Sequence, residues 1–132
     1  SMFALGFSLF SKKKVICLDG DGSFLMHMGA SVISANFAKE NFKYILLNNS
    51  CHESVGCQPT SIDKINLKKY SYSVGFKKYF LLKDKKDIKK ILKSFLKLSN
   101  PAFLEVRINN FSHENLPRIK DLKTLKKGFL KK

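Results

Sequence analysis

Two short apolar runs, each followed at once by a polar motif, constrain the fold of this chain more than any other feature. Residues 15–19 lead into Gly-Asp-Gly-Ser at 20–23, and residues 44–47 lead into Asn48 and Asn49. Apolar runs of this length are typical of strands that are buried on both faces of a parallel sheet. Open α/β folds bind ligands at the carboxyl edge of such a sheet, so we expect both motifs to meet there.

The spacing of apolar residues in the rest of the chain predicts the other helices and strands of such a fold. A helical spacing of apolar residues follows the first motif, a short helix starts at Asp63 and stops at Gly75, and a strongly amphipathic helix starts at Asp84 or Asp87. In order, we expect strands over 15–19, 44–47, 78–82 and 102–108, with helices over 24–38, 63–74 and 84–98 between them. Residues 3–10 are expected to be the last turns of a buried helix. This alternation predicts an α/β fold, a three-layer open parallel sheet with helices on both faces.

The charge of the chain raises nucleic acid as a partner, but its distribution argues against one. The formal net charge is +15, from 25 Lys and Arg against 10 Asp and Glu. The lysines are spread over many segments, arginine occurs only at Arg107 and Arg118, and no stacking platform accompanies them. We also find no apolar run near the ~20 residues of a membrane span and no signal-peptide pattern. We therefore expect a cytoplasmic location, without nucleic acid or membrane partners.

The three cysteines form an odd set without the spacing of a disulfide framework, which is typical of a reducing compartment. Cys17 falls in a core strand and is expected to be inert. Cys51 and Cys57, together with His52, raise the possibility of zinc. A second pair of ligands is absent, which argues against a structural zinc site.

The two polar motifs, with the spacing found here, resemble the diphosphate-binding motif of thiamine diphosphate (ThDP) enzymes. Residues 24–30, Phe-Leu-Met-His-Met-Gly-Ala, and 52–60, His-Glu-Ser-Val-Gly-Cys-Gln-Pro-Thr, further resemble phosphonopyruvate decarboxylase, with sulfopyruvate decarboxylase next. The resemblance covers roughly residues 4–109. One departure is Cys57, where that family usually has a second glycine, so the resemblance does not set the shape of the loop before Gln58. Leu25 stands where a nicotinamide-binding fingerprint needs its third glycine, which argues against that class.

The resemblance implies a Mg²⁺ site and a diphosphate site. Asp21 and Asn49 would ligate Mg²⁺ through their side chains and Cys51 through its backbone carbonyl, with diphosphate oxygens and water completing an octahedron. Backbone N–H groups at the first motif would hold the diphosphate, and Asn48 would secure the strand end. The implied cofactor-binding residues are Gly20, Asp21, Gly22, Ser23, Asn49 and Cys51. The candidate catalytic residues are His52 and Glu53, whereas His27 and His113 are expected to be structural.

The reaction that the resemblance implies is the ThDP-dependent decarboxylation of phosphonopyruvate to phosphonoacetaldehyde and CO₂. Sulfopyruvate decarboxylase and other ThDP enzymes are alternatives. An alternative from a different functional class is a non-catalytic basic assembly or nucleic-acid-binding module, which only the positive charge suggests.

In this superfamily a glutamate from a pyrimidine-binding domain activates the cofactor across a subunit interface, and the chain has no candidate for that domain. We therefore expect a pyrimidine-binding domain or subunit as partner, in a homo- or hetero-oligomer, and no activity of the chain alone. The relatives carry a Gly-Ser-Met-Gly segment ahead of the counterpart of residues 4–6, and it is not found here. We expect residues 1–132 to form a single diphosphate- and Mg²⁺-binding domain truncated at its N-terminus, with residues 112–132 as a loop and terminal helix.

Overall fold

The protein is described by a computed structural model that covers residues 1–110 and 120–130. The prediction for His113 and that of a loop from residue 112 to 119 lie outside the described residues. Within the described part of the chain, no helix is long and apolar enough to cross a bilayer.

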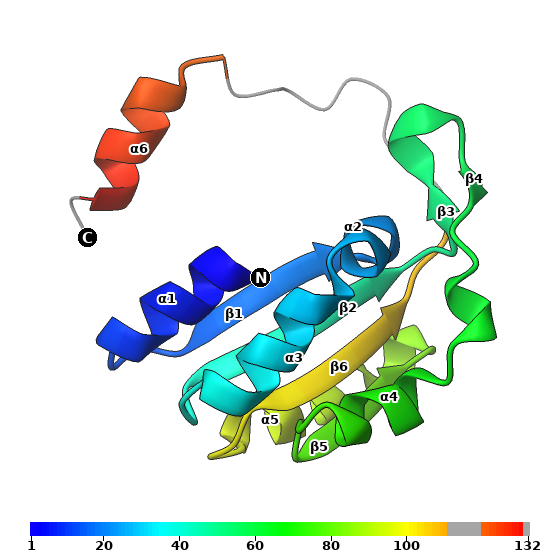
Figure 1. Cartoon of the computed structure of the whole chain (residues 1–132), viewed down its shortest axis with the longest axis horizontal. Coiled ribbons are helices and arrows are strands. Elements are labelled where there is room, and N and C mark those ends of the chain that lie inside the picture. The colour runs from blue at the N-terminus through cyan, green and yellow to red at the C-terminus, as the bar shows by residue number, and fades with distance from the viewer. Residues whose placement is uncertain (111–119, 131–132) are drawn as a thin grey trace.

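A four-stranded sheet, parallel throughout, organises the fold (Figure 1). Its strands, in spatial order, are β1 (Val15–Gly20), β2 (Phe42–Asn48), β6 (Ala102–Arg107) and β5 (Lys78–Leu82). Each adjacent pair is parallel, and Gly20 lies opposite Leu47 at the carboxyl ends of β1 and β2. The chain therefore places β6 between β2 and β5, although β5 comes first in sequence.

Helices cover both faces of this sheet, which confirms the predicted three-layer α/β fold. The expectation that the first strand is buried on both faces was wrong, because β1 lies at the sheet edge with Ile16 and Leu18 exposed. Apolar side chains of α2, α3 and α4 pack into one core and those of α5 into a second core on the opposite face. The helices are α1 (Met2–Phe10), α2 (Asp21–Met26), α3 (Met28–Phe37), α4 (Leu67–Ser73), α5 (Ile88–Lys97) and α6 (Leu122–Leu130), with 3-10 turns η1 (Glu53–Val55), η2 (Ile62–Lys64) and η3 (Lys85–Asp87). Beyond the carboxyl edge of the sheet, β3 (Cys51–His52) and β4 (Gln58–Pro59) form a short antiparallel hairpin.

Aromatic rings fill the larger core and hold the central strands to the helices. Tyr44 of β2 stacks on Phe103 of β6, with ring centroids 5.2 Å apart and planes 9° apart. Phe24 of α2 meets both rings edge-on, and each of the three is almost completely buried. Offset and edge-on pairs of this kind add about 0.5–1.5 kcal/mol each beyond the area they bury. These contacts anchor α2 against the face of the sheet, directly after β1 ends.

Three of the predictions for the helices were wrong, and two of them concern where a helix breaks or begins. The helix expected over 24–38 is two helices, because His27 leaves helical geometry at φ −131° and ψ 35°. The helix expected from Asp63 begins at Leu67, where the side chain of Asn66 accepts from the backbone N–H of Lys69 at 2.9 Å. The predicted stop at Gly75 is confirmed, since its φ of +117° is a left-handed conformation that favours glycine.

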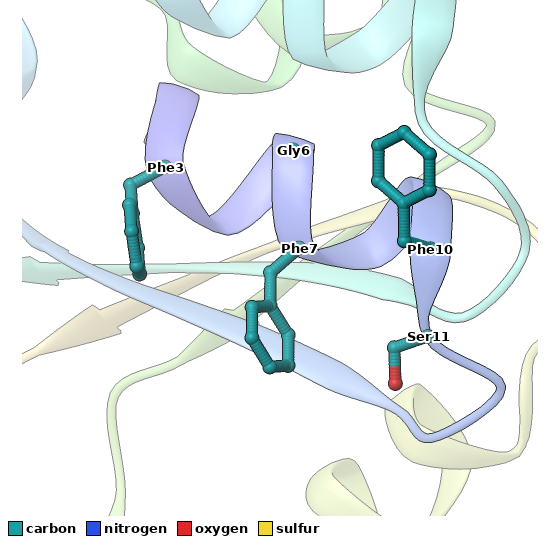
Figure 2. Close-up of a pocket in the computed structure, with 5 residues that line it drawn as sticks. All are labelled: Phe3, Gly6, Phe7, Phe10 and Ser11. Atoms are coloured by element: carbon teal, nitrogen blue, oxygen red, sulfur yellow. The ribbon is translucent and has the colours of Figure 1, made fainter. Parts of the chain in front are cut away.

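The third correction concerns α1, which we expected to be a buried helix. Leu5 and Ser8 are its buried residues, whereas Phe10 is 93% exposed. The outer side of α1 instead borders a hollow of about 540 Å³ lined by Phe3, Gly6, Phe7, Phe10 and Ser11 (Figure 2).

Candidate cofactor site

The residues predicted for the site come together at the carboxyl edge of the sheet. A cavity of about 390 Å³ opens where β1 and β2 end, within the usual size range of small-molecule sites. Its lining includes all eight predicted residues: Gly20, Asp21, Gly22, Ser23, Asn49, Cys51, His52 and Glu53. The parallel pairing of β1 with β2 explains this meeting, because it carries both polar motifs to the same edge.

Asp21 begins α2 and is 98% buried, an uncommon position for a carboxyl side chain. Its Oδ2 accepts a hydrogen bond of 2.7 Å from the hydroxyl of Thr60. Within the described residues, no hydrogen bond reaches its other oxygen, Oδ1, and Asp21 lines the cavity. The site therefore offers a carboxylate that is held on one side and has an acceptor left for a ligand.

Gly22 lies directly beneath the ring of His52. A Cβ placed on Gly22 would come within 2.5 Å of His52 Nδ1 and 2.8 Å of Cε1, so a side chain here would displace the ring. A Cβ on Gly20, in contrast, would meet nothing within 4 Å. Glycine at 22 thus leaves the room that the His52 ring occupies, whereas the space beside Gly20 is open.

The turn after β2 is built from the side chains of the two asparagines. Asn48 is buried, and its Oδ1 accepts from the backbone N–H of Ser50 at 3.1 Å, which confirms that it secures the strand end. Asn49 lines the cavity; its Oδ1 accepts from the backbone N–H of Cys51 at 3.2 Å, and its Nδ2 donates to Glu53 at 3.2 Å. The predicted metal ligand and the predicted catalytic carboxylate are thus in direct contact.

A buried charged network behind this turn was missed by the sequence analysis. Glu105 of β6 is 2% exposed and accepts from Asn48 Nδ2 at 3.0 Å and from the Tyr79 hydroxyl at 2.5 Å. Arg107 lies 2.6 Å from Glu105 through Nε, and its Nη1 donates to Asp63 at 2.7 Å. Burial and the neighbouring Glu105 carboxylate raise the pKa of Tyr79, so its hydroxyl stays protonated and donating. This network holds the turn of Asn48 against the sheet.

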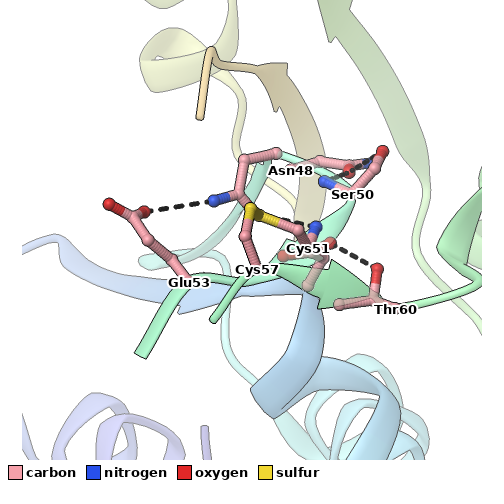
Figure 3. The surroundings of a disulfide bond; sticks show 8 residues. Asn48, Ser50, Cys51, Glu53, Cys57 and Thr60 are labelled. Atoms are coloured by element: carbon pink, nitrogen blue, oxygen red, sulfur yellow. Dashed lines mark hydrogen bonds between the residues drawn. A yellow bond between two sulfur atoms is a disulfide. The ribbon is translucent and has the colours of Figure 1, made fainter. Parts of the chain in front are cut away.

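The loop that follows is closed by a disulfide between Cys51 and Cys57, which the odd number and the spacing of the cysteines did not predict (Figure 3). The bridge uses both thiols of the zinc alternative, and the described residues hold no group of three His, Cys, Asp or Glu side chains that could bind a metal. Cys17 is the free, buried cysteine that the sequence predicted, and burial raises the pKa of its thiol.

The structure also explains how Cys57 can stand where the resembling family usually has glycine. Cys57 has a φ of +59°, in the left-handed region that favours glycine, and its N–H donates to the carbonyl of His52 at 2.9 Å. The backbone here thus has the left-handed form suited to the glycine usual in the resembling family, and the cysteine side chain adds a covalent link to Cys51.

His27 lies outside this arrangement. It is exposed at the break between α2 and α3, its Nδ1 is 3.2 Å from the carbonyl of Ser23, and it is not part of the cavity lining. This position fits the structural role expected for it.

Residues 2–106 match the family described as thiamine pyrophosphate enzyme, C-terminal TPP binding domain, and this match covers most of the chain. The chain belongs to this family. Thiamine pyrophosphate is another name for ThDP, so the resemblance drawn from the two polar motifs is confirmed. The family model ends within β6, so it includes every residue that lines the cavity except Ile108.

Curated relatives of this TPP-binding domain are 2-oxo acid decarboxylases. The chain is 40% identical over 76 residues to sulfopyruvate decarboxylase subunit beta of Methanothermobacter thermautotrophicus, covering 58% of this chain and 41% of the relative. It is 28% identical over 116 residues to phosphonopyruvate decarboxylase of Streptomyces viridochromogenes (88% and 29%). It is also 30% identical over 120 residues to sulfopyruvate decarboxylase of Methanosarcina acetivorans (89% and 31%). The chain thus spans less than half the length of these relatives.

The residues of the site fit a diphosphate with a divalent cation. Mg²⁺ prefers oxygen ligands and usually shares them with phosphate oxygens. The Oδ1 of Asp21, the side chain of Asn49 and the carbonyl of Cys51 all belong to residues that line the cavity, and the space at Gly20 is open. Three protein oxygens with a single carboxylate make an incomplete ligand set, which a bound diphosphate would complete.

Proposed function

We propose that this TPP-binding domain is the diphosphate-binding half of a ThDP-dependent 2-oxo acid decarboxylase that requires Mg²⁺. The observation that carries the proposal is the single cavity that collects Asp21, Asn49 and the glycine motif at 20–23. In this proposal Asp21, Asn49 and the Cys51 carbonyl hold Mg²⁺, and the N–H groups of the glycine motif bind the diphosphate. When bound, ThDP supplies the electron sink that decarboxylation needs.

The residues of the hairpin act on the substrate side of the site. His52 lies over Gly22, and Glu53 accepts from Asn49, so both side chains are next to the groups that hold the cofactor. We assign them to orienting the substrate and to proton transfer during release of the product aldehyde. The loop that carries them is linked at Cys51 and Cys57, which keeps both side chains close to the cavity.

One candidate substrate is phosphonopyruvate, converted to phosphonoacetaldehyde and CO₂ in phosphonate biosynthesis. Sulfopyruvate is the other candidate and has the stronger support, because the beta-subunit relative has the higher identity, 40% against 28%. Both are 2-oxo acids with a strongly anionic group on C3. The formal charge of +15 favours the approach of such anions.

The second half of the proposed enzyme is a pyrimidine-binding domain or subunit, in a homo- or hetero-oligomer. The relatives from M. thermautotrophicus and Methanocaldococcus jannaschii are each described as a beta subunit, which supports a partner chain. We expect no decarboxylation by this chain alone and turnover when the pyrimidine-binding partner is added.

The test combines calorimetry and turnover. ThDP is titrated into the chain with its partner in the presence and absence of Mg²⁺, and both 2-oxo acids are assayed for CO₂ release. We expect binding that requires Mg²⁺ and is weakened at least tenfold by Asp21→Ala and by Asn49→Ala, about 1.4 kcal/mol. Tight ThDP binding in both variants would refute the metal assignment, and no ThDP binding by the unmodified chain would refute the proposed function in favour of a non-catalytic basic module.

A further inference from the structure

The carboxylate of Asp21 receives a hydrogen bond from a residue on the other side of the site. Thr60 follows β4 at the far end of the hairpin, and its Oγ1 lies 2.7 Å from Asp21 Oδ2. Both side chains are nearly inaccessible, with 6% exposure for Thr60 and 2% for Asp21. A buried carboxylate without a donor is costly, so this bond decides how Asp21 is oriented.

The position of Thr60 is itself fixed by the turn that carries the other predicted ligands. The N–H of Thr60 donates to the carbonyl of Ser50 at 3.1 Å, and the preceding Pro59 pairs with Cys51 across the hairpin. Thr60 therefore contacts both halves of the site: its backbone contacts the turn after β2, and its side chain contacts the first residue of α2. Thr60 thus links Asp21 to the turn that carries Cys51, beside the packing of His52 on Gly22.

We propose that Thr60 is a positioning residue for the divalent cation, because it holds Asp21 Oδ2 and so directs Oδ1 into the cavity. The inference rests on the proposed function, since it assumes that a cation binds between Asp21 and the turn after β2. Mg²⁺ demands near-octahedral geometry and tolerates displaced ligands poorly. A carboxylate free to rotate would lower the affinity for the cation, and with it the affinity for the diphosphate.

Two substitutions at Thr60 separate the hydroxyl from the shape of the side chain. Thr60→Val keeps the branched shape and removes the donor, whereas Thr60→Ser keeps the donor. Ser34→Ala is a matched control, because Ser34 is also fully buried and its hydroxyl donates at 2.8 Å to the carbonyl of Ala30, within α3. Each variant is compared by thermal unfolding without ligand and by calorimetric titration of ThDP at a series of Mg²⁺ concentrations, all with the pyrimidine-binding partner present.

We expect Thr60→Val to raise the Mg²⁺ concentration needed for half-maximal ThDP binding at least tenfold. Thr60→Ser should restore it to within about threefold, and Ser34→Ala should leave it unchanged even where its unfolding temperature falls. An unchanged Mg²⁺ requirement in Thr60→Val, with normal binding by the unmodified chain, would overturn the role of Thr60 and leave the proposed function intact. If the unmodified chain binds no ThDP at any Mg²⁺ concentration, the proposed function fails and this inference fails with it.

Discussion

Reduction of the Cys51–Cys57 disulfide should destabilise the domain by an amount that its short loop sets. The two cysteines are 6 positions apart, and loop-closure entropy for a ring of that size gives about 2 kcal/mol at 25 °C. Urea unfolding monitored by circular dichroism, with and without reductant, measures this difference directly. Without reductant, the free energy of unfolding of Cys57→Ser should be lower than that of the unmodified chain by the same amount. Adding reductant should then cause no further loss in this variant.

Cys57→Gly provides the matched control for the backbone. Glycine also breaks the bridge, but it removes the cost of a left-handed conformation at φ +59°, about 1–2 kcal/mol for a residue with a Cβ. Cys57→Gly should therefore be more stable than Cys57→Ser, by an amount reduced by the extra freedom of glycine in the unfolded chain. The reasoning fails if reductant leaves the unfolding midpoint of the unmodified chain unchanged, or if thiol titration of the denatured, non-reduced chain finds three free thiols instead of the one expected at Cys17.

Three further predictions concern the site and its support. Gly22→Ala places a Cβ within 2.5 Å of His52 and should weaken ThDP binding severalfold in calorimetry; adding His52→Ala should restore binding, and a double variant as weak as the single one would contradict this packing. In the complete enzyme, His52→Ala and Glu53→Gln should each lower kcat at least tenfold with little change in ThDP affinity, because the proposed function places these side chains on the substrate side of the site; rates within about twofold, a barrier change of only ~0.4 kcal/mol, would remove them from the mechanism. Glu105→Gln should lower the urea unfolding free energy by about 1.5–3 kcal/mol, since it leaves Arg107 without its buried partner, and an unchanged midpoint would show that the network contributes nothing to stability.

Local patterns in the sequence were enough to place the strands and the two motifs. The runs at 15–19 and 44–47 are apolar at alternate positions on both sides of the strand, and each leads directly into its polar motif. Any parallel pairing of these two strands therefore brings the eight predicted residues to one edge of the sheet. The stop at Gly75 and the role of Asn48 were also predictable, because each depends on a conformation or hydrogen bond within a few residues. The break at His27 was not, since apolar spacing continues through it.

What the sequence determined by itself is therefore the class of the fold and the order of its elements, which follow from short-range periodicity. It also indicated the residues of the candidate site, through the resemblance of the two motifs. The tertiary structure alone decided the strand order, in which β6 lies between β2 and β5, and hence that Glu105 reaches Asn48. It also decided that Thr60 reaches Asp21, a contact across 39 positions. Such contacts join buried polar groups from distant segments, and no local pattern of hydrophobicity or turn residues specifies which donor will meet which acceptor once the chain is packed.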